Sequence, residues 1–343
     1  MTQNDIEVAV VGYGFAGSIF HAPLITATPG LHLRTIVSQN PVKVRADFPD
    51  VSVAADLATA LADPNIDLVV IATPNALHAP QGHAALAAGK HVIVDKPFAV
   101  TLDEARSVAA HAAQVNRVLS VYQNRRWDGD FLTVRRLIAE GGLGAVRHFE
   151  SHFDRFRLAL RSRWREQAQP GSGLWFDLGS HLLDQALQLF GRPQAIYADF
   201  AMHRERSEAV DYFHVLLRYS DLRAILHASA LVVEGRLRFA VHGTAGSFIK
   251  YGLDGQEASL KAGLRPGGIG WGEDANPGVF TPGEGSPSPV LAEPGDYPRY
   301  YAEIRDCING HGPNPVPPSQ ALETMEILMI AIQSAAERRE IAC

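Results

Sequence analysis

The chain has 343 residues, more than one ordinary domain needs and about right for two, and its hydrophobic content of 46% is ample for two cores. Its net charge is −6, with Lys and Arg scattered along the chain, so no basic patch points to nucleic acid or to an anionic membrane. The N-terminus is polar and acidic, and no run approaches the ~20 apolar residues of a membrane span. We therefore expect a cytoplasmic protein whose partners are small molecules or further subunits.

The first feature along the chain is a glycine-rich turn within residues 8–24, VAVVGYGFAGSIFHAPL. In a dinucleotide-binding unit the first glycine of G-x-G-x-x-G makes a tight turn, the second lets the backbone approach a pyrophosphate, and the third packs the helix closely. The motif alone fits any glycine-rich strand-to-helix turn. Apolar strands predicted at 31–38 and 67–72 supply the context of a βαβ unit. The residues expected to bind the cofactor here are Gly12, Gly14, Phe15, Ala16 and Gly17.

The end of the second predicted strand indicates which dinucleotide is bound. NAD-binding units carry an Asp or Glu here that accepts hydrogen bonds from the ribose 2′-hydroxyl. This chain has Ser38 instead, with Lys43 shortly after, and a missing carboxylate beside a cation favours the 2′-phosphate of NADP. NAD remains possible, because Lys43 could equally be a solvated helix residue.

Two further strands end in polar residues. Thr73 and Asn75 follow the strand at 67–72 and are expected to contact the nicotinamide half of the cofactor, whereas His78 could equally be a helix-surface residue. The apolar strand 91–95 leads directly into Lys96 and Pro97, which places Lys96 in the ligand crevice of an open α/β sheet, beside cofactor and substrate. A helix at 101–115 with a capping box and a strand at 118–122 complete a Rossmann domain over residues 1–124.

Residues 125–343 predict a second domain of α+β type. A strand at 145–156 carries polar side chains such as His152 and Asp154, which is costly in a sheet unless they face water or a ligand. Short connections between later strands imply hairpins, hence a large, mostly antiparallel sheet with helices on one face. Residues 263–298, rich in Gly and Pro, predict one long loop. The other expected elements are strands at 196–202, 212–219, 223–231, 236–242 and 247–251, and helices at 131–140, 300–309 and 322–338.

The segment 171–191, GSGLWFDLGSHLLDQALQLFG, predicts a helix with Asp177 and His181 one turn apart. Such a pair projects from one helix face. It could stabilise the helix, His181 could be a satisfied core histidine, or the pair could act on a ligand. Two ligands on one helix without a third make a metal unlikely, and two isolated cysteines form neither a zinc site nor a disulfide framework, so we expect no metal.

Taken together, these motifs resemble the Gfo/Idh/MocA oxidoreductases, which join an N-terminal Rossmann domain to a C-terminal α/β domain. The resemblance spans the chain and rests on the glycine-rich turn, on Asp95-Lys96-Pro97 where the family usually has Glu-Lys-Pro, and on residues 173–181. Residues 124–128, 151–155 and 251–257 look like those of the NADP-dependent scyllo-inositol dehydrogenase subgroup.

The resemblance implies a hydride-transfer enzyme acting on a cyclic polyol or sugar, with Lys96, Asp177 and His181 as catalytic residues. His181 would take the hydroxyl proton, Lys96 would polarise the substrate oxygen, and Asp177 would accept a hydrogen bond from the substrate. An NADPH-dependent ketosugar reductase and a non-enzymatic dinucleotide-binding regulator remain alternatives. The residues expected to bind the substrate are Arg125, Trp127, His152, Asp154 and Trp164.

The predicted sheet of the second domain also bears on assembly. Its strands hold more apolar side chains than one layer of helices is expected to cover, and a large exposed apolar patch would be a liability on a monomer. We therefore expect a homodimer or homotetramer that pairs through this sheet. The side chains expected on its outer face are Leu216, Ile225, Phe239 and Val241.

Overall fold

The computed structural model describes residues 5–161, 164–233 and 237–343, which form two compact units. One unit holds the chain up to Asn124 together with Gln256–Trp271 and Asp296–Leu322. The other holds Arg125–Gly255, Gly272–Gly295 and Glu323–Cys343. The chain therefore passes between the units more often than the sequence pattern indicates.

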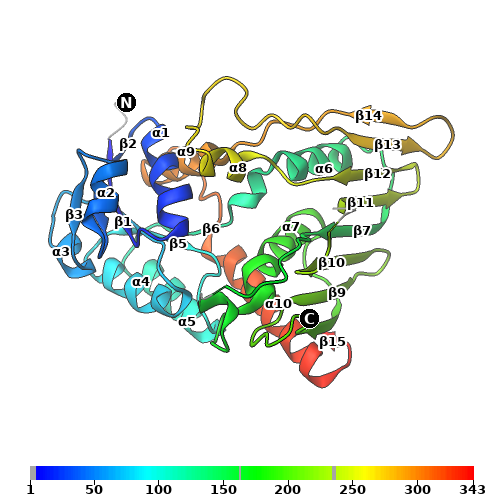
Figure 1. Cartoon of the computed structure of the whole chain (residues 1–343), viewed down its shortest axis with the longest axis horizontal. Coiled ribbons are helices and arrows are strands. Elements are labelled where there is room, and N and C mark those ends of the chain that lie inside the picture. Colours follow the sequence, from blue (N-terminus) through cyan, green and yellow to red (C-terminus); the bar gives the residue numbers. More distant parts are fainter. Residues whose placement is uncertain (1–4, 162–163, 234–236) are drawn as a thin grey trace. The chain divides into compact units, whose positions relative to one another are not determined.

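A six-stranded parallel sheet forms the centre of the first unit (Figure 1). Its strand order is β3-β2-β1-β4-β5-β6, so the direction of winding reverses between β1 and β4. This is the Rossmann arrangement, in which ligands bind outside the carboxyl ends of the strands at the switch point. The strands are β1 (Ile6–Val11), β2 (Leu31–Val37), β3 (Ser52–Ala54), β4 (Leu68–Ile71), β5 (His91–Asp95) and β6 (Leu119–Tyr122).

Helices cover this sheet, because its central strands are apolar on both faces. All four residues of β4 are buried, as a continuous apolar run in a parallel sheet requires. Helix α5 (Leu102–Gln114) begins with the predicted capping box, in which Thr101 and Glu104 each accept a hydrogen bond from the other's backbone nitrogen. The other helices are α1 (Ala22–Ala27), α2 (Pro41–Asp47), α3 (Leu57–Leu61), α4 (His78–Ala87), α8 (Gln256–Lys261) and α9 (Tyr297–Ile308).

The second unit contains a nine-stranded sheet of order β14-β13-β12-β11-β7-β10-β9-β8-β15. Among the described residues every strand pair in it is antiparallel except β7 with β10, which confirms the mostly antiparallel sheet. The strands are β7 (Val146–His152), β8 (Ala195–Ala201), β9 (Tyr212–Arg218), β10 (Arg223–Ser229), β11 (Leu237–Gly243), β12 (Gly246–Tyr251), β13 (Gly278–Pro282), β14 (Ser288–Val290) and β15 (Ile341–Ala342).

One face of this sheet packs against helices α6 (Gly129–Ala139), α7 (Ser180–Phe190) and α10 (Pro318–Glu337) (Figure 1). Side chains alternate along each strand, so the residues between the core positions face the other way, onto what we call the uncovered face. Phe239 and Val241 are fully buried in the helix-covered core, so the prediction that they lie on the outer face is wrong. Leu216 and Ile225 alternate with core residues and do lie on the uncovered face. None of the helices in the described ranges is long and apolar enough to span a bilayer.

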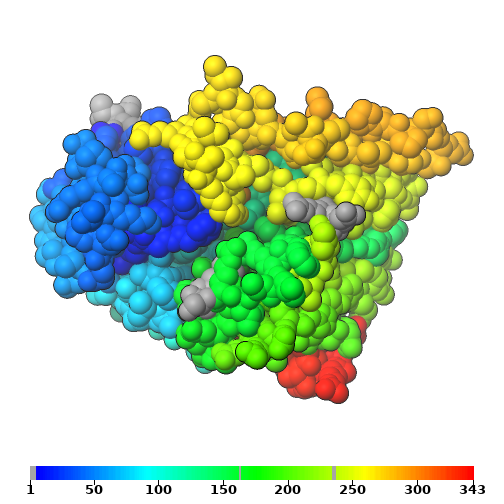
Figure 2. Space-filling view, in the orientation of Figure 1, coloured from blue at the N-terminus to red at the C-terminus, as the bar shows by residue number. Residues whose placement is uncertain are grey.

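The Gly- and Pro-rich segment 263–298 is not one long loop, as predicted, because it contains the hairpin of β13 and β14. Pro282 and Pro289 belong to these strands, and proline is tolerated at a sheet edge, where no ladder hydrogen bond is lost. The hairpin lies at the surface, drawn in orange in Figure 2. The short strand β15 closes the opposite edge by pairing with β8.

Candidate active site

Close backbone contacts shape the glycine-rich turn that follows β1. Gly12 has φ +97°, and a Cβ atom there would lie 2.7 Å from the carbonyl oxygen of Ala72. A Cβ atom on Gly17 would overlap the carbonyl oxygen of Gly12, so helix and strand approach closely only because residue 17 is glycine. Nothing lies within 4 Å of a Cβ position on Gly14. The backbone at Gly14 is thus open on the side from which a phosphate can approach.

Two other residues of the motif lie beside the same turn. Ala16 precedes a π-helical turn, Gly17–His21, that leads into α1. The Phe15 ring is 50% exposed and meets Phe20 edge-on with ring centroids 5.8 Å apart. The Lys261 ammonium lies 5.2 Å from the Phe15 ring centroid. An exposed aromatic ring and a cation therefore flank the glycine-rich turn.

Of the polar residues after β2, Lys43 contacts this turn as well. Ser38 Oγ accepts a hydrogen bond from the Asn40 nitrogen over 3.1 Å, and neither residue is a carboxylate. Lys43 Nζ lies 3.4 Å from two oxygens, the Tyr13 carbonyl and Ser18 Oγ. Although Lys43 is an exposed helix residue, its ammonium folds back onto the glycine-rich turn. This contact argues against the alternative of a merely solvated lysine.

A cavity of about 510 Å³ adjoins the turn within the same unit. Its lining includes the cations Lys43, Lys261 and Arg265, against one carboxylate, Asp47. Asp47 accepts a hydrogen bond from the Tyr13 hydroxyl over 2.8 Å, and burial, together with this carboxylate, raises the pKa of Tyr13 well above its usual range. The excess of positive charge suits an anionic ligand.

His78 joins the loops that follow β4 and β5. Its ring is buried, with Nδ1 2.9 Å from the Pro97 carbonyl oxygen and Nε2 2.9 Å from the Thr73 carbonyl oxygen. A neutral ring donates through one nitrogen and an imidazolium through both. Asn75 is also buried, at the start of a short 3₁₀ turn, and the Thr73 hydroxyl donates a hydrogen bond to Gln81 Oε1 over 2.7 Å. His78 thus fixes the loop geometry and is not a helix-surface residue.

Lys96 follows β5 directly, at the carboxyl edge of the parallel sheet. Asp95 Oδ1 accepts a hydrogen bond from the Lys96 backbone nitrogen over 2.9 Å, and the Lys96–Pro97 peptide bond is cis. Behind Asp95, His21 Nε2 lies 3.9 Å from the same carboxylate oxygen. Burial lowers the pKa of His21 to about 4, so this ring is neutral near pH 7. His21 Nδ1 lies 2.6 Å from the Tyr301 hydroxyl, which anchors the ring from its other side.

In the second unit, Asp177 and His181 lie where a π-helical turn, Trp175–Gly179, leads into α7. The prediction that they share a helix face assumes α-helical spacing, but a π-turn is closed by i→i+5 hydrogen bonds, so a four-residue separation no longer guarantees it. Gly179 permits this geometry, because a Cβ atom there would overlap the Trp175 ring. Asp177 is partly exposed, whereas the His181 residue is only 4% exposed.

Arginines surround Asp177 and were not predicted. Arg165 Nε lies 3.5 Å and Arg155 Nη2 3.8 Å from its carboxylate oxygens, and both line a small cavity with it. The Arg165 guanidinium also stacks over the Trp164 ring, 4.6 Å from the centroid, which brings one predicted substrate residue close to Asp177. The run of basic residues after β7 is the feature of the sequence that could have indicated these arginines. The sequence alone does not show that they form ion pairs with Asp177.

Arg125 and Trp127 are each 6% exposed and belong to the buried interior of the second unit. Arg125 Nη1 donates a hydrogen bond to Asp128 Oδ2 over 3.2 Å, and its guanidinium stacks on the Phe153 ring at 4.7 Å. Phe153 lies in the helix-covered core. From these buried positions Arg125 and Trp127 can hold neighbouring residues in place.

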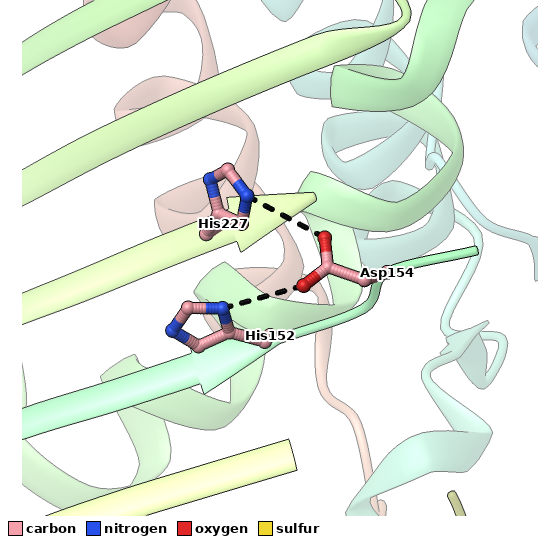
Figure 3. Close-up of side chains that lie close together, drawn as sticks. All are labelled: His152, Asp154 and His227. Atoms are coloured by element: carbon pink, nitrogen blue, oxygen red, sulfur yellow. Dashed lines mark ion pairs between the residues drawn. The ribbon is translucent and has the colours of Figure 1, made fainter. Parts of the chain in front are cut away.

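His152 and Asp154 flank Phe153 in the chain but point to the uncovered face. There they meet His227 of β10, and the three side chains point toward one another (Figure 3). Asp177 and His181 belong to the helix-covered side of the same unit. The structure therefore brings His152 and Asp154 together with a histidine that sequence reasoning missed and away from the other predicted substrate residues.

Comparison with known families extends these observations to the whole chain. The model described as "Oxidoreductase family, NAD-binding Rossmann fold" matches residues 6–123, and "Oxidoreductase family, C-terminal alpha/beta domain" matches residues 135–343. The uncharacterized oxidoreductase YdgJ of Escherichia coli (strain K12) is 52% identical over 98% of both chains. The scyllo-inositol 2-dehydrogenase (NADP(+)) IolW of Bacillus subtilis (strain 168) is 39% identical over 98% of this chain and 96% of its own.

Solved structures agree with this relationship. That of the Yersinia pestis protein YPO2259 superposes with a TM-score of 0.96 at 49% identity, covering 99% of this chain and 97% of that one. Both family models, the Rossmann strand order and the glycine-rich turn therefore lead to one conclusion. The chain belongs to the Gfo/Idh/MocA family of oxidoreductases, with a Rossmann NAD(P)-binding domain.

Proposed function

We propose that this oxidoreductase transfers hydride between NADP and a hydroxyl or ketone carbon of a cyclic polyol or sugar of the inositol class. The observation that carries the proposal is the similarity over 98% of the chain, at 39% identity, to a protein named as an NADP-dependent scyllo-inositol 2-dehydrogenase. Lys96, Asp177 and His181 stand at the positions where the family resemblance expects catalytic residues.

The choice of NADP is supported by the residues after β2. No carboxylate follows the strand, and the Lys43 ammonium lies 3.4 Å from the Tyr13 carbonyl oxygen of the glycine-rich turn. The adjoining cavity adds Lys261 and Arg265. The three cations outnumber the one carboxylate of the cavity lining, Asp47, and an excess of positive charge favours a 2′-phosphate over a 2′-hydroxyl.

In this proposal His181 takes the hydroxyl proton as the carbinol carbon is oxidised and returns it in the reverse direction. Lys96 polarises the substrate oxygen with its positive charge. Asp177 accepts a hydrogen bond from the substrate, and the guanidinium groups of Arg155 and Arg165 lie 3.8 and 3.5 Å from its carboxylate oxygens. The nicotinamide ring, when bound, accepts or supplies the hydride.

The predicted substrate-binding residues divide into two groups in this scheme. Trp164 stacks with Arg165, which pairs with Asp177, so we propose Trp164 as a substrate contact. Arg125 and Trp127 are buried, and in this scheme they hold neighbouring residues in place. His152 and Asp154 lie on the uncovered face and have no part in it.

Turnover assays test the proposal and separate it from its alternatives. Purified protein is given NADP⁺ with a panel of inositols and sugars, and NADPH with ketoinositols and ketosugars, while NADPH absorbance is followed. We expect turnover of an inositol-class pair. Turnover of ketosugars alone would favour the reductase. Tight NADPH binding without turnover of any compound would favour the non-enzymatic regulator.

A further inference from the structure

The uncovered face of the second unit carries a group of donor atoms outside the proposed active site. His152 is the last residue of β7, Asp154 follows two positions later, and His227 lies on β10 directly opposite His152 in the parallel register. One atom from each side chain belongs to a set in which all atoms lie within 4.8 Å of one another. Figure 3 shows the rings of His152 and His227, on neighbouring strands, directed at the Asp154 carboxylate, each toward a different oxygen.

The separations within this group fit shared coordination better than direct hydrogen bonding. His152 Nδ1 lies 3.5 Å from Asp154 Oδ2, and His227 Nε2 lies 3.5 Å from Asp154 Oδ1. Hydrogen bonds from nitrogen to oxygen are about 2.7–3.2 Å long. The two distances end on different oxygens of the same carboxylate, and each is close to the ~3.3 Å that separates two ligands of a tetrahedral ion bound at about 2.0–2.1 Å.

Neighbouring groups hold two of the three donors in the orientation that a metal ligand needs. His152 Nε2 lies 2.8 Å from Glu150 Oε2, so a proton on Nε2 leaves Nδ1 as the free acceptor facing Asp154. Glu150 is held in turn by His148 Nε2 at 2.7 Å. The Ser229 backbone nitrogen donates to Asp154 Oδ1 over 2.9 Å and fixes that carboxylate. A carboxylate behind a ligating histidine is the usual outer shell of a protein metal site.

We propose that His152, Asp154 and His227 bind one divalent transition-metal ion, with Zn²⁺ as the preferred ion. Two imidazole nitrogens and one carboxylate oxygen form a donor set that zinc takes in three-ligand sites, with water in the fourth position. Within one chain the two histidine side chains are each 15% exposed and Asp154 is 7% exposed, so the donor group is largely buried.

The location assigns this ion a structural role. Within the described ranges β7 and β10 form the one parallel pair of the sheet, and the ion would tie the ends of both strands to the segment after β7. Phe153 turns into the core between the two ligands of that segment. The side chains of the proposed active site in this unit lie on the helix-covered side. The metal site is therefore independent of the proposed function.

Metal binding to the full-length protein tests this inference. Protein stripped with a chelator is dialysed against Zn²⁺, the bound ion is counted by elemental analysis, and tetrahedral coordination is monitored by the visible absorption of Co²⁺. We expect one ion per chain. His227→Ala and Asp154→Asn should each weaken binding by on the order of 100-fold, and Glu150→Gln by about 10- to 100-fold because it removes only the orienting carboxylate.

His214→Ala is the matched control, because its ring lies 5.6 Å from that of His227 on the same face but supplies no donor to the group. It should bind Zn²⁺ like the wild type. Circular dichroism identifies any variant that fails to fold, in which case Glu150→Gln carries the test. Wild-type protein that binds Zn²⁺ no more tightly than Asp154→Asn would overturn the inference. Binding lost instead on replacing Cys307 and Cys343 with serine would overturn it as well.

Discussion

Asp95 Oδ1 accepts a hydrogen bond of 2.9 Å from the backbone nitrogen of Lys96, the next residue in the chain. The family usually has glutamate at this position, and the shorter side chain of Asp95 reaches its own neighbour's backbone. Asp95 is 7% exposed, so loss of the acceptor would leave a partly buried donor unsatisfied. This contact fixes the backbone from which the proposed catalytic lysine extends.

We therefore expect Asp95→Ala to lower the free energy of unfolding by about 1–3 kcal/mol, the cost of an unsatisfied buried donor. Asp95→Asn keeps an acceptor oxygen, so its free energy of unfolding should fall by less. Urea unfolding of the three proteins, followed by circular dichroism, measures the difference. Equal midpoints for wild type and Asp95→Ala would mean that the contact contributes nothing to stability.

The second prediction concerns the cofactor. Lys43→Ala should weaken NADP⁺ binding about tenfold, or roughly 1.4 kcal/mol, and leave NAD⁺ binding unchanged. Arg45→Ala is the control, because Arg45 is an exposed cation on the same helix as Lys43. Calorimetric titration of each variant with NAD⁺ and with NADP⁺ measures these affinities. The assignment of NADP as the cofactor would be refuted if Lys43→Ala kept the wild-type preference for NADP⁺ over NAD⁺, or if the wild type bound NAD⁺ and NADP⁺ equally tightly.

Much of the first unit could be predicted because its signals are local. The buried run of β4 and the capping box at Thr101 and Glu104 are each contained in a few consecutive residues. The glycine-rich turn is equally local, since Gly12 needs a positive φ and Gly17 a close packing that only glycine allows. Such signals can be recognised in the sequence without knowledge of the tertiary structure.

The second unit was less predictable because its pairings join distant segments. β13 and β14 lie in a Gly- and Pro-rich stretch without periodicity, and their place at the sheet edge comes from pairing with β12. His227 meets His152 only because β10 runs parallel to β7 in a sheet that is otherwise antiparallel. The π-helical turn at Trp175–Gly179 likewise follows from packing around Trp175, which the spacing of Asp177 and His181 does not reveal.

A third prediction follows from Asp128, which is buried among charges. Burial raises its pKa to about 8, opposed by Arg125 and Arg238 and reinforced by Asp254 and Asp130. The unfolded chain has an aspartate pKa of about 3.9. Folding therefore favours the protonated form of Asp128. The contribution of this group to the free energy of unfolding is fully present below about pH 4 and is lost as the pH rises towards about 8.

Asp128→Asn cannot titrate at this position, so the stability of the wild type relative to the variant should fall as the pH rises from about 5 to about 8. Urea unfolding across this range measures the trend. Asp221→Asn serves as the control, because the Asp221 side chain is 75% exposed. Parallel pH curves for wild type and Asp128→Asn would contradict a raised pKa.

The fourth prediction is a homodimer or homotetramer through the uncovered face. That face carries the exposed rings of Tyr197 and Tyr251 and the aliphatic side chains of Leu216 and Ile225, which a monomer would leave in water. Light scattering at micromolar concentration should give at least twice the chain mass. Leu216→Glu should lower that mass, and Val42→Glu, an exposed position in the first unit, should not. A wild-type mass of one chain would reject the prediction.

The last prediction is that Lys96 and His181 carry out the chemistry. Removing a general base costs about 10²- to 10⁴-fold in turnover, so His181→Ala should lose that much kcat, and Lys96→Met should lose a comparable amount because the substrate oxygen is no longer polarised. NADP⁺ affinity should barely change, since the glycine-rich turn and the residues after β2 are intact in both variants. His214→Ala replaces a half-buried histidine on the uncovered face and should turn over like the wild type. Variants of Lys96 and His181 that fold, bind NADP⁺ and keep near-wild-type kcat would show that other residues carry the reaction.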